Sequence, residues 1–144
     1  MSAGIDIKIL YLDNDAMEVG LSVRNGRFGG SIEFYATHDV LKTIAATFRG
    51  FPKSADDHRE LEVGTFDPSF AGGGARFELA TSKRGPVIIR AHLRADGTLT
   101  TTKEGESVDL ELVIEPASID RFVEALDLMD VAVSATAHLD GAAT

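Results

Sequence analysis

Residues 17–50 read MEVGLSVRNGRFGGSIEFYATHDVLKTIAATFRG, and this stretch predicts two antiparallel strands followed by a helix. Apolar residues alternate with polar or small ones over residues 17–23, a period of two that turns one set of side chains to a buried face. The dipeptide Asn25-Gly26 comes directly afterwards and predicts a tight hairpin turn, because both residues tolerate positive φ. A return strand over residues 28–36 then completes the hairpin.

An amphipathic helix is expected to follow this hairpin, over about residues 38–49. Thr37 is the expected N-cap, with Asp39 in the first turn, where the helix dipole favours an anion. Apolar side chains then recur at helical spacing, and Gly50 predicts the end of the helix.

The same plan, strands closed by a helix, recurs in the second half of the chain. A strand is also expected over residues 5–10, before the hairpin. The further strands are predicted over residues 59–63, 75–79, 87–94, 98–103 and 108–114. Pro116 suits the first turn of a second amphipathic helix, over about residues 116–129. Turn residues between consecutive strands favour antiparallel pairing, and the helices need an apolar surface to cover.

These elements predict an α+β fold. About eight mainly antiparallel strands form a curved sheet or two packed sheets, with two amphipathic helices. Residues 1–130 are expected to make a single domain, followed by a weakly structured tail over residues 131–144, which is rich in Ala. The run Gly72-Gly73-Gly74 is expected to be a flexible hairpin loop rather than a phosphate cradle, because a strand and not a helix follows it.

Composition narrows the function classes. The chain has 144 residues, 44% hydrophobic and 26% charged, no Cys, and a formal net charge of -9. An acidic chain repels a phosphate backbone, which disfavours nucleic-acid binding, and it would attract a basic protein partner. The simpler interpretation is that the net negative charge keeps the protein soluble. The lack of Cys, of a signal-peptide pattern and of a long apolar run predicts a cytoplasmic protein with no membrane segment.

Catalytic and metal motifs are not found in the sequence. No His-Glu-x-x-His or Gly-x-Ser-x-Gly pattern occurs, and Asp56-Asp57-His58 is more typical of a polar linker than of a metal site. We therefore expect no catalytic residue, metal or cofactor, and a protein that is not an enzyme.

Two groups of charged residues are candidate binding surfaces. The basic group is Arg76, Arg90, His92 and Arg94. The acidic group is Glu60, Glu62, Asp109 and Glu111. Either group could bind a ligand or a partner. The favoured interpretation is that opposite charges on neighbouring strands pair with each other across the sheet.

The segment Met17–Gly50 also carries a resemblance to a known family. An alternating strand ends in Val-Arg-Asn-Gly, continues into Phe-x-Gly-x-x-Glu, and leads to a helix that stops at Gly-Phe-Pro. Residues 112–122, Leu-Val-Ile-Glu-Pro-Ala-x-Ile-Asp-x-Phe, repeat the entry from strand into helix. Together these motifs resemble the small bacterial proteins grouped around the WapI-type immunity proteins of contact-dependent toxin systems. The resemblance implies a non-enzymatic protein that binds and neutralises a toxin domain, and it transfers no catalytic residue.

The leading expectation is therefore a non-enzymatic protein-binding module, immunity-like, that neutralises a basic toxin domain. The alternative is a small-molecule binding or accessory domain with Arg90, His92 and Arg94 near the mouth of its cavity. An enzyme of unrecognised type is the third hypothesis. A homodimer through a sheet edge is a further expectation, with the polar stretch Thr98 to Lys103 as the candidate edge.

Overall fold

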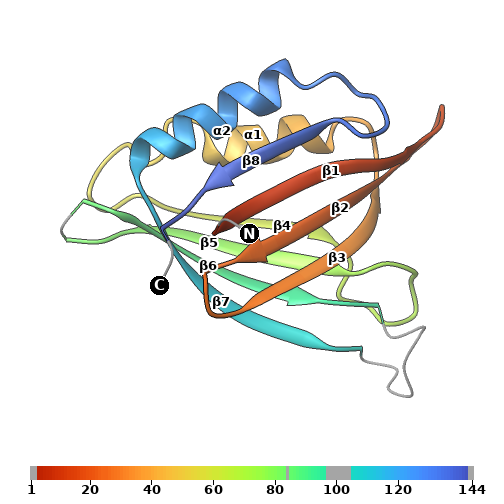
Figure 1. Cartoon of the computed structure of the whole chain (residues 1–144), viewed down its shortest axis with the longest axis horizontal. Helices are drawn as coiled ribbons and strands as arrows, with labels where there is room; N and C mark the ends of the chain where they lie inside the picture. The colour runs from red at the N-terminus through yellow and green to blue at the C-terminus, as the bar shows by residue number, and fades with distance from the viewer. Residues whose placement is uncertain (1–2, 84, 97–104, 143–144) are drawn as a thin grey trace.

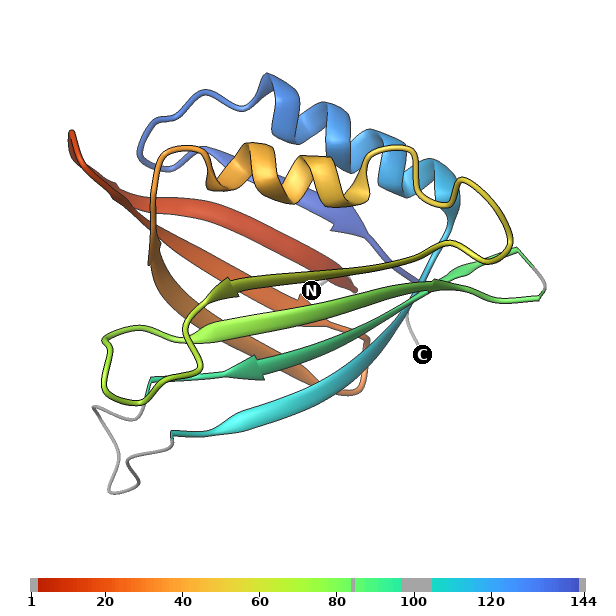
Figure 2. The same ribbon diagram turned by 180° about the vertical axis from the view of Figure 1, so that it is seen from behind.

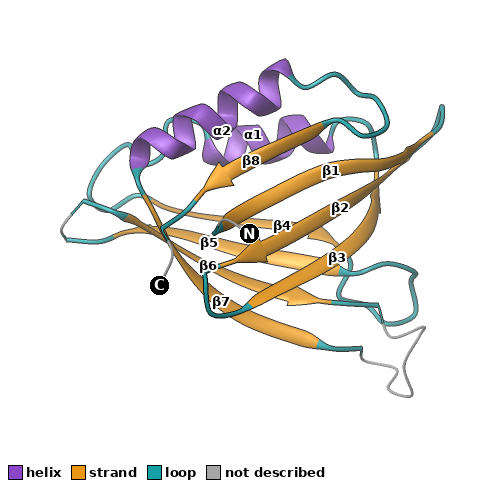
Figure 3. Ribbon diagram, in the orientation of Figure 1, coloured by secondary structure: helices purple, strands orange, loops and turns teal. Residues whose placement is uncertain are grey.

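The computed structural model describes residues 3–83, 85–96 and 105–142, which form eight strands and two helices (Figures 1 and 3). The strands are β1 (Gly4–Leu12), β2 (Met17–Arg24), β3 (Gly29–Ala36), β4 (His58–Gly64), β5 (Gly74–Thr81), β6 (Val87–Arg94), β7 (Ser107–Ile114) and β8 (Thr136–Asp140). The helices are α1 (Val40–Phe48) and α2 (Pro116–Leu128). The predicted α+β class is confirmed, and the strands form two sheets rather than one.

Each sheet has four antiparallel strands. The first sheet has the order β3-β2-β1-β8 and the second has the order β4-β5-β6-β7. The sheets pack face to face, with β3 contacting every strand of the second sheet. On the side away from β3, the sheets end in β8 and β4, and both helices lie over this side (Figures 1 and 2). There α2 packs on β8 and on α1, and α1 contacts β4.

The core lies between the two sheets and beneath the helices. Each strand sends alternate side chains inward, and each helix buries one stripe, as their sequence periods require. Phe48 of α1 and Phe122 of α2 meet edge to face, with ring centroids 5.2 Å apart. The largest fully buried side chains include Phe34, Phe48, Phe77, Phe122, Ile5, Ile7, Ile9, Met17, Leu21, Ile44, Leu79 and Ile89.

The hairpin predicted at Asn25-Gly26 is confirmed, but its loop is longer than two residues. Only Gly26 of the pair has positive φ. The Asn25 side chain is buried, and its carbonyl oxygen accepts hydrogen bonds from the backbone N–H groups of Arg27 and Phe28. Its amide also donates to the Glu111 carbonyl of β7, at 3.2 Å, so this turn residue ties the hairpin to the second sheet.

The run Gly72-Gly73-Gly74 is not the flexible loop that its composition suggested. All three glycines are buried, and the Gly73 N–H donates to the Glu33 carbonyl of β3 at 2.7 Å. A Cβ on Gly73 would lie 2.5 Å from the Arg94 carbonyl oxygen. The glycines therefore let two backbones approach closely where β3 crosses the second sheet.

The first helix begins later than predicted. It starts at Val40, Asp39 occupies the N-cap position, and no side chain caps the helix. The prediction of Thr37 as N-cap is wrong, because the Thr37 hydroxyl donates to the Asp39 carboxylate instead of accepting from the helix backbone. Gly50 ends the helix with a φ of 67°, as expected.

The predicted tail also differs. Residues 131–134 turn, and Thr136–Asp140 then form β8, which pairs with β1 and buries Ala137 and Leu139. The strand has small side chains and therefore a weak apolar pattern in the sequence. Its stability comes from pairing with β1 and from packing against α2. The strand predicted over residues 98–103 lies outside the described residues.

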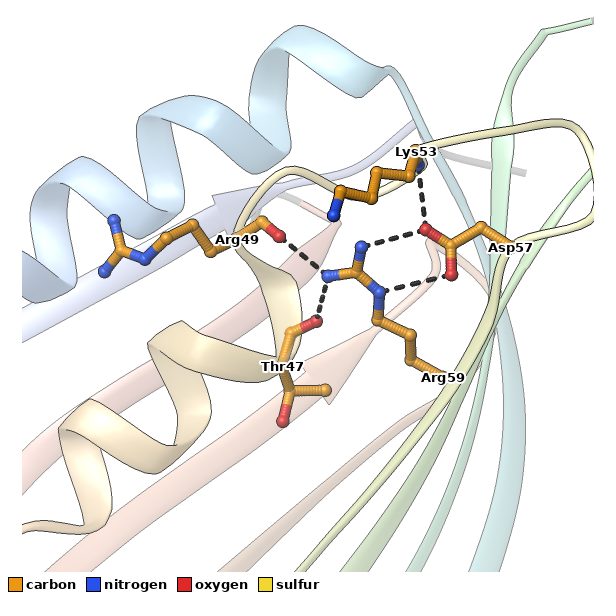
Figure 4. A network of polar contacts seen from close by, with 5 residues as sticks. All are labelled: Thr47, Arg49, Lys53, Asp57 and Arg59. Atoms are coloured by element: carbon orange, nitrogen blue, oxygen red, sulfur yellow. Dashed lines mark hydrogen bonds and ion pairs between the residues drawn. The ribbon is translucent and has the colours of Figure 1, made fainter.

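A polar network joins the end of α1 to the start of β4 (Figure 4). Arg59 donates to the carbonyls of Thr47 and Arg49, at 3.0 and 2.7 Å, and so satisfies acceptors that the helix end leaves open. Its guanidinium also pairs with Asp57 at 2.8 Å, and Asp57 accepts the Lys53 N–H. These hydrogen bonds lower the pKa of Asp57, with the Arg59 contact contributing most. Asp57 is thus part of a structural network at the end of α1.

Candidate functional site

The outer face of the second sheet carries the charged residues singled out in the sequence. They stand opposite one another on neighbouring strands, and three pairs form. Arg76 pairs with Glu62 at 2.9 Å, Arg90 with Glu111 at 3.5 Å, and His92 with Asp109 at 2.7 Å. The favoured interpretation, pairing across the sheet, is therefore confirmed for these six residues.

The β4–β5 loop covers one end of this face. Phe66 of the loop stacks on the His92 ring, with centroids 5.6 Å apart, and the Arg76 guanidinium lies 4.5 Å from the Phe66 ring centroid. Arg94, expected to point outward beside Arg90 and His92, is 7% exposed. Phe66 also lies against Gly74, the register partner of Arg94, so the loop lies close to this end of β6.

The predicted basic and acidic surfaces are thus one mixed face. A shallow hollow of about 420 Å³ lies over it, lined by Arg76, Glu78, Arg90, Ala91, His92, Asp109, Leu110 and Glu111. Glu60 faces Glu78 on the neighbouring strand. Six of these residues pair locally, but Glu60 and Glu78 face each other as like charges, so this face keeps a residual negative charge on β4 and β5.

The outer face of the first sheet has a different character. Its register sets the outward side chains in three rows across the strands. The first row is His138, Asp6, Ser22 and Ser31; the second is Thr136, Lys8, Gly20 and Glu33; the third is Tyr11, Glu18 and Tyr35. A bulge in β1 between Ile9 and Tyr11 also brings Leu10 to this face, where it lies beside Gly20.

A groove of about 720 Å³ lies over these rows. Gly20 lines it between Lys8 of β1 and Glu33 of β3, and the Leu10 side chain lies 3.2 Å from where a Gly20 Cβ would be. Ala71, Gly72, Ala95 and Asp96 form the rim beyond β3. They belong to the segments before β5 and after β6, and the Asp96 carboxylate fixes the rim by accepting the Gly72 N–H at 3.0 Å.

Acidic side chains predominate in this groove. Its lining includes the carboxylates Asp6, Glu18, Glu33 and Asp96, and Lys8 is its lone cationic side chain within the described chain. Asp6 pairs with His138 at 2.8 Å. Within the described residues, neither Glu18 nor Glu33 forms an ion pair. The groove therefore holds negative charge that this face does not neutralise.

Tyr35 stands beside these carboxylates and is 58% exposed. The negative charge of Glu18 raises the pKa of Tyr35, and the hydrogen bond between the two side chains adds to this effect. The charges of Glu33 and Asp96 contribute in the same direction. The hydroxyl thus lies in the negative field of three carboxylates.

The polar groups of this face do not form a catalytic relay. In a Ser–His–Asp relay the imidazole lies between the nucleophile and the carboxylate. Here Asp6 lies between His138 and Ser22, and the Ser22 hydroxyl meets the Ser31 hydroxyl at 2.9 Å. Over residues 3–83, 85–96 and 105–142, no group of three or more His, Asp or Glu side chains could hold a metal ion. Neither described helix is long and apolar enough to cross a bilayer.

The groove was missed in the sequence because its residues looked individually ordinary. Glu18, Gly20 and Ser22 were assigned to the outward face of their strand, and that assignment is confirmed. The available signal was Gly20, a residue with no side chain in the middle of an alternating strand. The rim comes from the segments before β5 and after β6, which no local pattern connects to β2.

Comparison of the chain with known protein families, with curated proteins and with solved structures found no significant match. The resemblance to WapI-type immunity proteins stays a prediction.

Proposed function

We propose that this protein is a non-enzymatic, immunity-like binding module that neutralises a basic toxin domain. The groove on the outer face of the first sheet is the proposed contact surface. The observation that carries the proposal is the concave groove on this face, in which Glu18 and Glu33 form no ion pair within the described residues, whereas six charged residues on the outer face of the second sheet pair with each other.

Two physical arguments support the choice of face. A concave surface lined by one sign of charge concentrates its field, which steers an oppositely charged partner and raises its rate of association. The groove also offers a platform of strand residues held in fixed register, with aromatic and aliphatic side chains among the carboxylates. Such a mixture provides both charge complementarity and apolar contact area.

The sheet edges are less suited to a partner. The Glu33 carbonyl of β3 accepts the Gly73 N–H, and the Glu111 and Val113 carbonyls of β7 accept Asn25 and Ala142. β8 lies against α2. Because these three carbonyls are already engaged and β8 is covered, we place the partner on a sheet face, and we keep a homodimer through an edge as the less favoured arrangement.

The proposal is tested with a fluorescent nona-lysine peptide as a minimal basic partner. The variant Glu18→Gln/Glu33→Gln removes two charges from the groove. Its matched control is Glu60→Gln/Glu124→Gln, which removes two charges at exposed positions outside the groove. We expect the groove variant to bind about three- to tenfold more weakly than wild type, from two lost ion pairs, with a smaller change in the control.

Fluorescence anisotropy over a range of salt concentrations measures both effects. Wild-type binding weakens as salt rises, and the groove variant shows a shallower dependence. Equal losses in the two variants would mean that only the overall charge attracts the peptide, and the proposal would then be wrong.

A small-molecule binding function is the second candidate, because a volume of about 720 Å³ is in the range of ligand pockets. The site would be the groove on the first sheet, not the strip near Arg90, His92 and Arg94. A thermal-shift screen of wild type and Gly20→Val, which fills the groove, tests this candidate. A genuine groove ligand stabilises only the wild type.

A further inference from the structure

Arginine recognises an aromatic ring and a carboxylate together at two places in this chain. Arg76 pairs with Glu62 through Nε and Nη2, at 3.0 and 2.9 Å, while its guanidinium lies 4.5 Å from the Phe66 ring centroid. Arg59 pairs with Asp57 and lies 5.1 Å from the Phe51 ring centroid. In both cases the planar cation contacts the ring and hydrogen-bonds the acid.

The groove contains the same two recognition elements around Tyr35. Glu18 is the register partner of Tyr35 on β2, and Glu33 is on the same face of β3, two residues before it. The Tyr35 ring is more than half exposed, and the pKa of its hydroxyl is raised first by the charge of Glu18. The two carboxylates therefore lie close to an accessible ring.

No cation of the described chain completes this arrangement. Lys8 is the lone cationic residue lining the groove, within the ranges described. It lies opposite Gly20, two strands from Glu33, which is a backbone separation of roughly 10 Å. It forms no ion pair with either glutamate.

We infer that Tyr35, Glu18 and Glu33 form a subsite for one arginine side chain of the basic partner. The aliphatic part of that side chain lies over Gly20 and Leu10, and the guanidinium contacts the Tyr35 ring while it hydrogen-bonds the two carboxylates. This inference rests on the proposed function and specifies which residue type the groove selects.

Arginine fits this subsite better than lysine for a geometric reason. The guanidinium is planar, so one face can stack on a ring while its edge donates to carboxylates. An ammonium group is a compact, strongly hydrated charge and gains less from the ring. At an exposed site the cation–π contact corresponds to an affinity gain of about two- to fivefold.

Two peptides isolate this effect. The first is nona-lysine, and the second has one arginine at its centre with four lysines on each side. Their charge is equal, so the difference in dissociation constant reports the single arginine. We expect the arginine peptide to bind wild type about two- to fivefold more tightly.

Tyr35→Leu removes the ring and should abolish the arginine preference while leaving nona-lysine binding nearly unchanged. Phe28→Leu is the matched control, because Phe28 is similarly exposed, at 63%, in the turn between β2 and β3 and does not line the groove. It should keep the full preference. Circular dichroism and urea unfolding of both variants establish that they are folded.

The outcomes separate this inference from the proposed function. If nona-lysine binding depends on Glu18 and Glu33 but the arginine peptide has no advantage, the arginine subsite is refuted and the acidic contact surface stands. An advantage that survives Tyr35→Leu equally refutes the subsite. If nona-lysine binding is indifferent to the two glutamates, the contact surface and its subsite fail together.

Discussion

Replacing Arg59 with Met should destabilise the fold more than any comparable change of an exposed arginine. The substitution keeps the aliphatic length and removes the hydrogen bonds to the carbonyls of Thr47 and Arg49. Hydrogen bonds to charged groups contribute about 1.5–3 kcal/mol each. The lower end applies here because the freed carbonyls at the helix end regain water, so the expected loss is about 3 kcal/mol for the two bonds.

Arg76→Met provides the matched control for this prediction. Arg76 also pairs with a carboxylate and contacts an aromatic ring, but its side chain is 48% exposed, compared with 22% for Arg59, and it caps no helix. An exposed pair of this kind contributes under about 1 kcal/mol.

Urea unfolding followed by circular dichroism gives the free energy of unfolding of both variants. Arg59→Lys retains the charge without the planar donors and should fall between wild type and Arg59→Met. If Arg59→Met and Arg76→Met lose the same free energy of unfolding, the network at the end of α1 is not the structural element described above.

Three further predictions follow from individual contacts. Gly73→Ala should lower the free energy of unfolding by about 1–3 kcal/mol, because the new Cβ would lie 2.5 Å from a backbone oxygen. The Cβ of Gly20→Ala would meet only side-chain atoms, so this variant should lose less free energy of unfolding in the same urea assay. Glu18→Gln should lower the raised pKa of Tyr35 toward its ordinary value of about 10, which tyrosinate absorbance measures in a variant whose other tyrosine is Phe; an unchanged pKa would contradict the placement of Glu18. The pKa of Asp57 is lowered by folding, so its contribution to stability is present above the unfolded value of about 3.9 and is lost as the pH falls toward the lower folded value. Asp57→Asn should therefore show a weaker loss of stability between neutral and acidic pH than wild type.

Local patterns in the sequence predict most of the fold. The alternation in β2 and the helical stripes of α1 and α2 correspond to buried faces of the structure, and Pro116 begins its helix as expected. Each of these signals depends on residues that are near one another in the chain, which is why sequence periodicity was sufficient.

The features that were missed depend on distant residues. β8 has a short and weakly apolar sequence, and it becomes a strand because β1 offers a partner and α2 covers it. The glycines at 72–74 are buried in a close backbone contact because β3 lies against them. Such contacts have no local signature.

The candidate site was predictable in part. Pairing of Arg76, Arg90 and His92 across the second sheet follows from period-two spacing of opposite charges, and it is confirmed. Arg94 is on the same face of β6 as Arg90 and His92, as predicted, but it is buried there and offers no exposed surface. The groove required the register of the first sheet and a rim from the second, and neither can be obtained from the sequence alone.

The central claim is that the outer face of the first sheet, and not that of the second, receives a basic partner. Nuclear magnetic resonance of the isotope-labelled protein titrated with nona-lysine tests it directly, residue by residue. The claim predicts saturable shifts of the amides of Glu18, Gly20 and Glu33, with little change at Glu62 and Glu111. Shifts centred on the second sheet, or spread evenly over both faces, would contradict it.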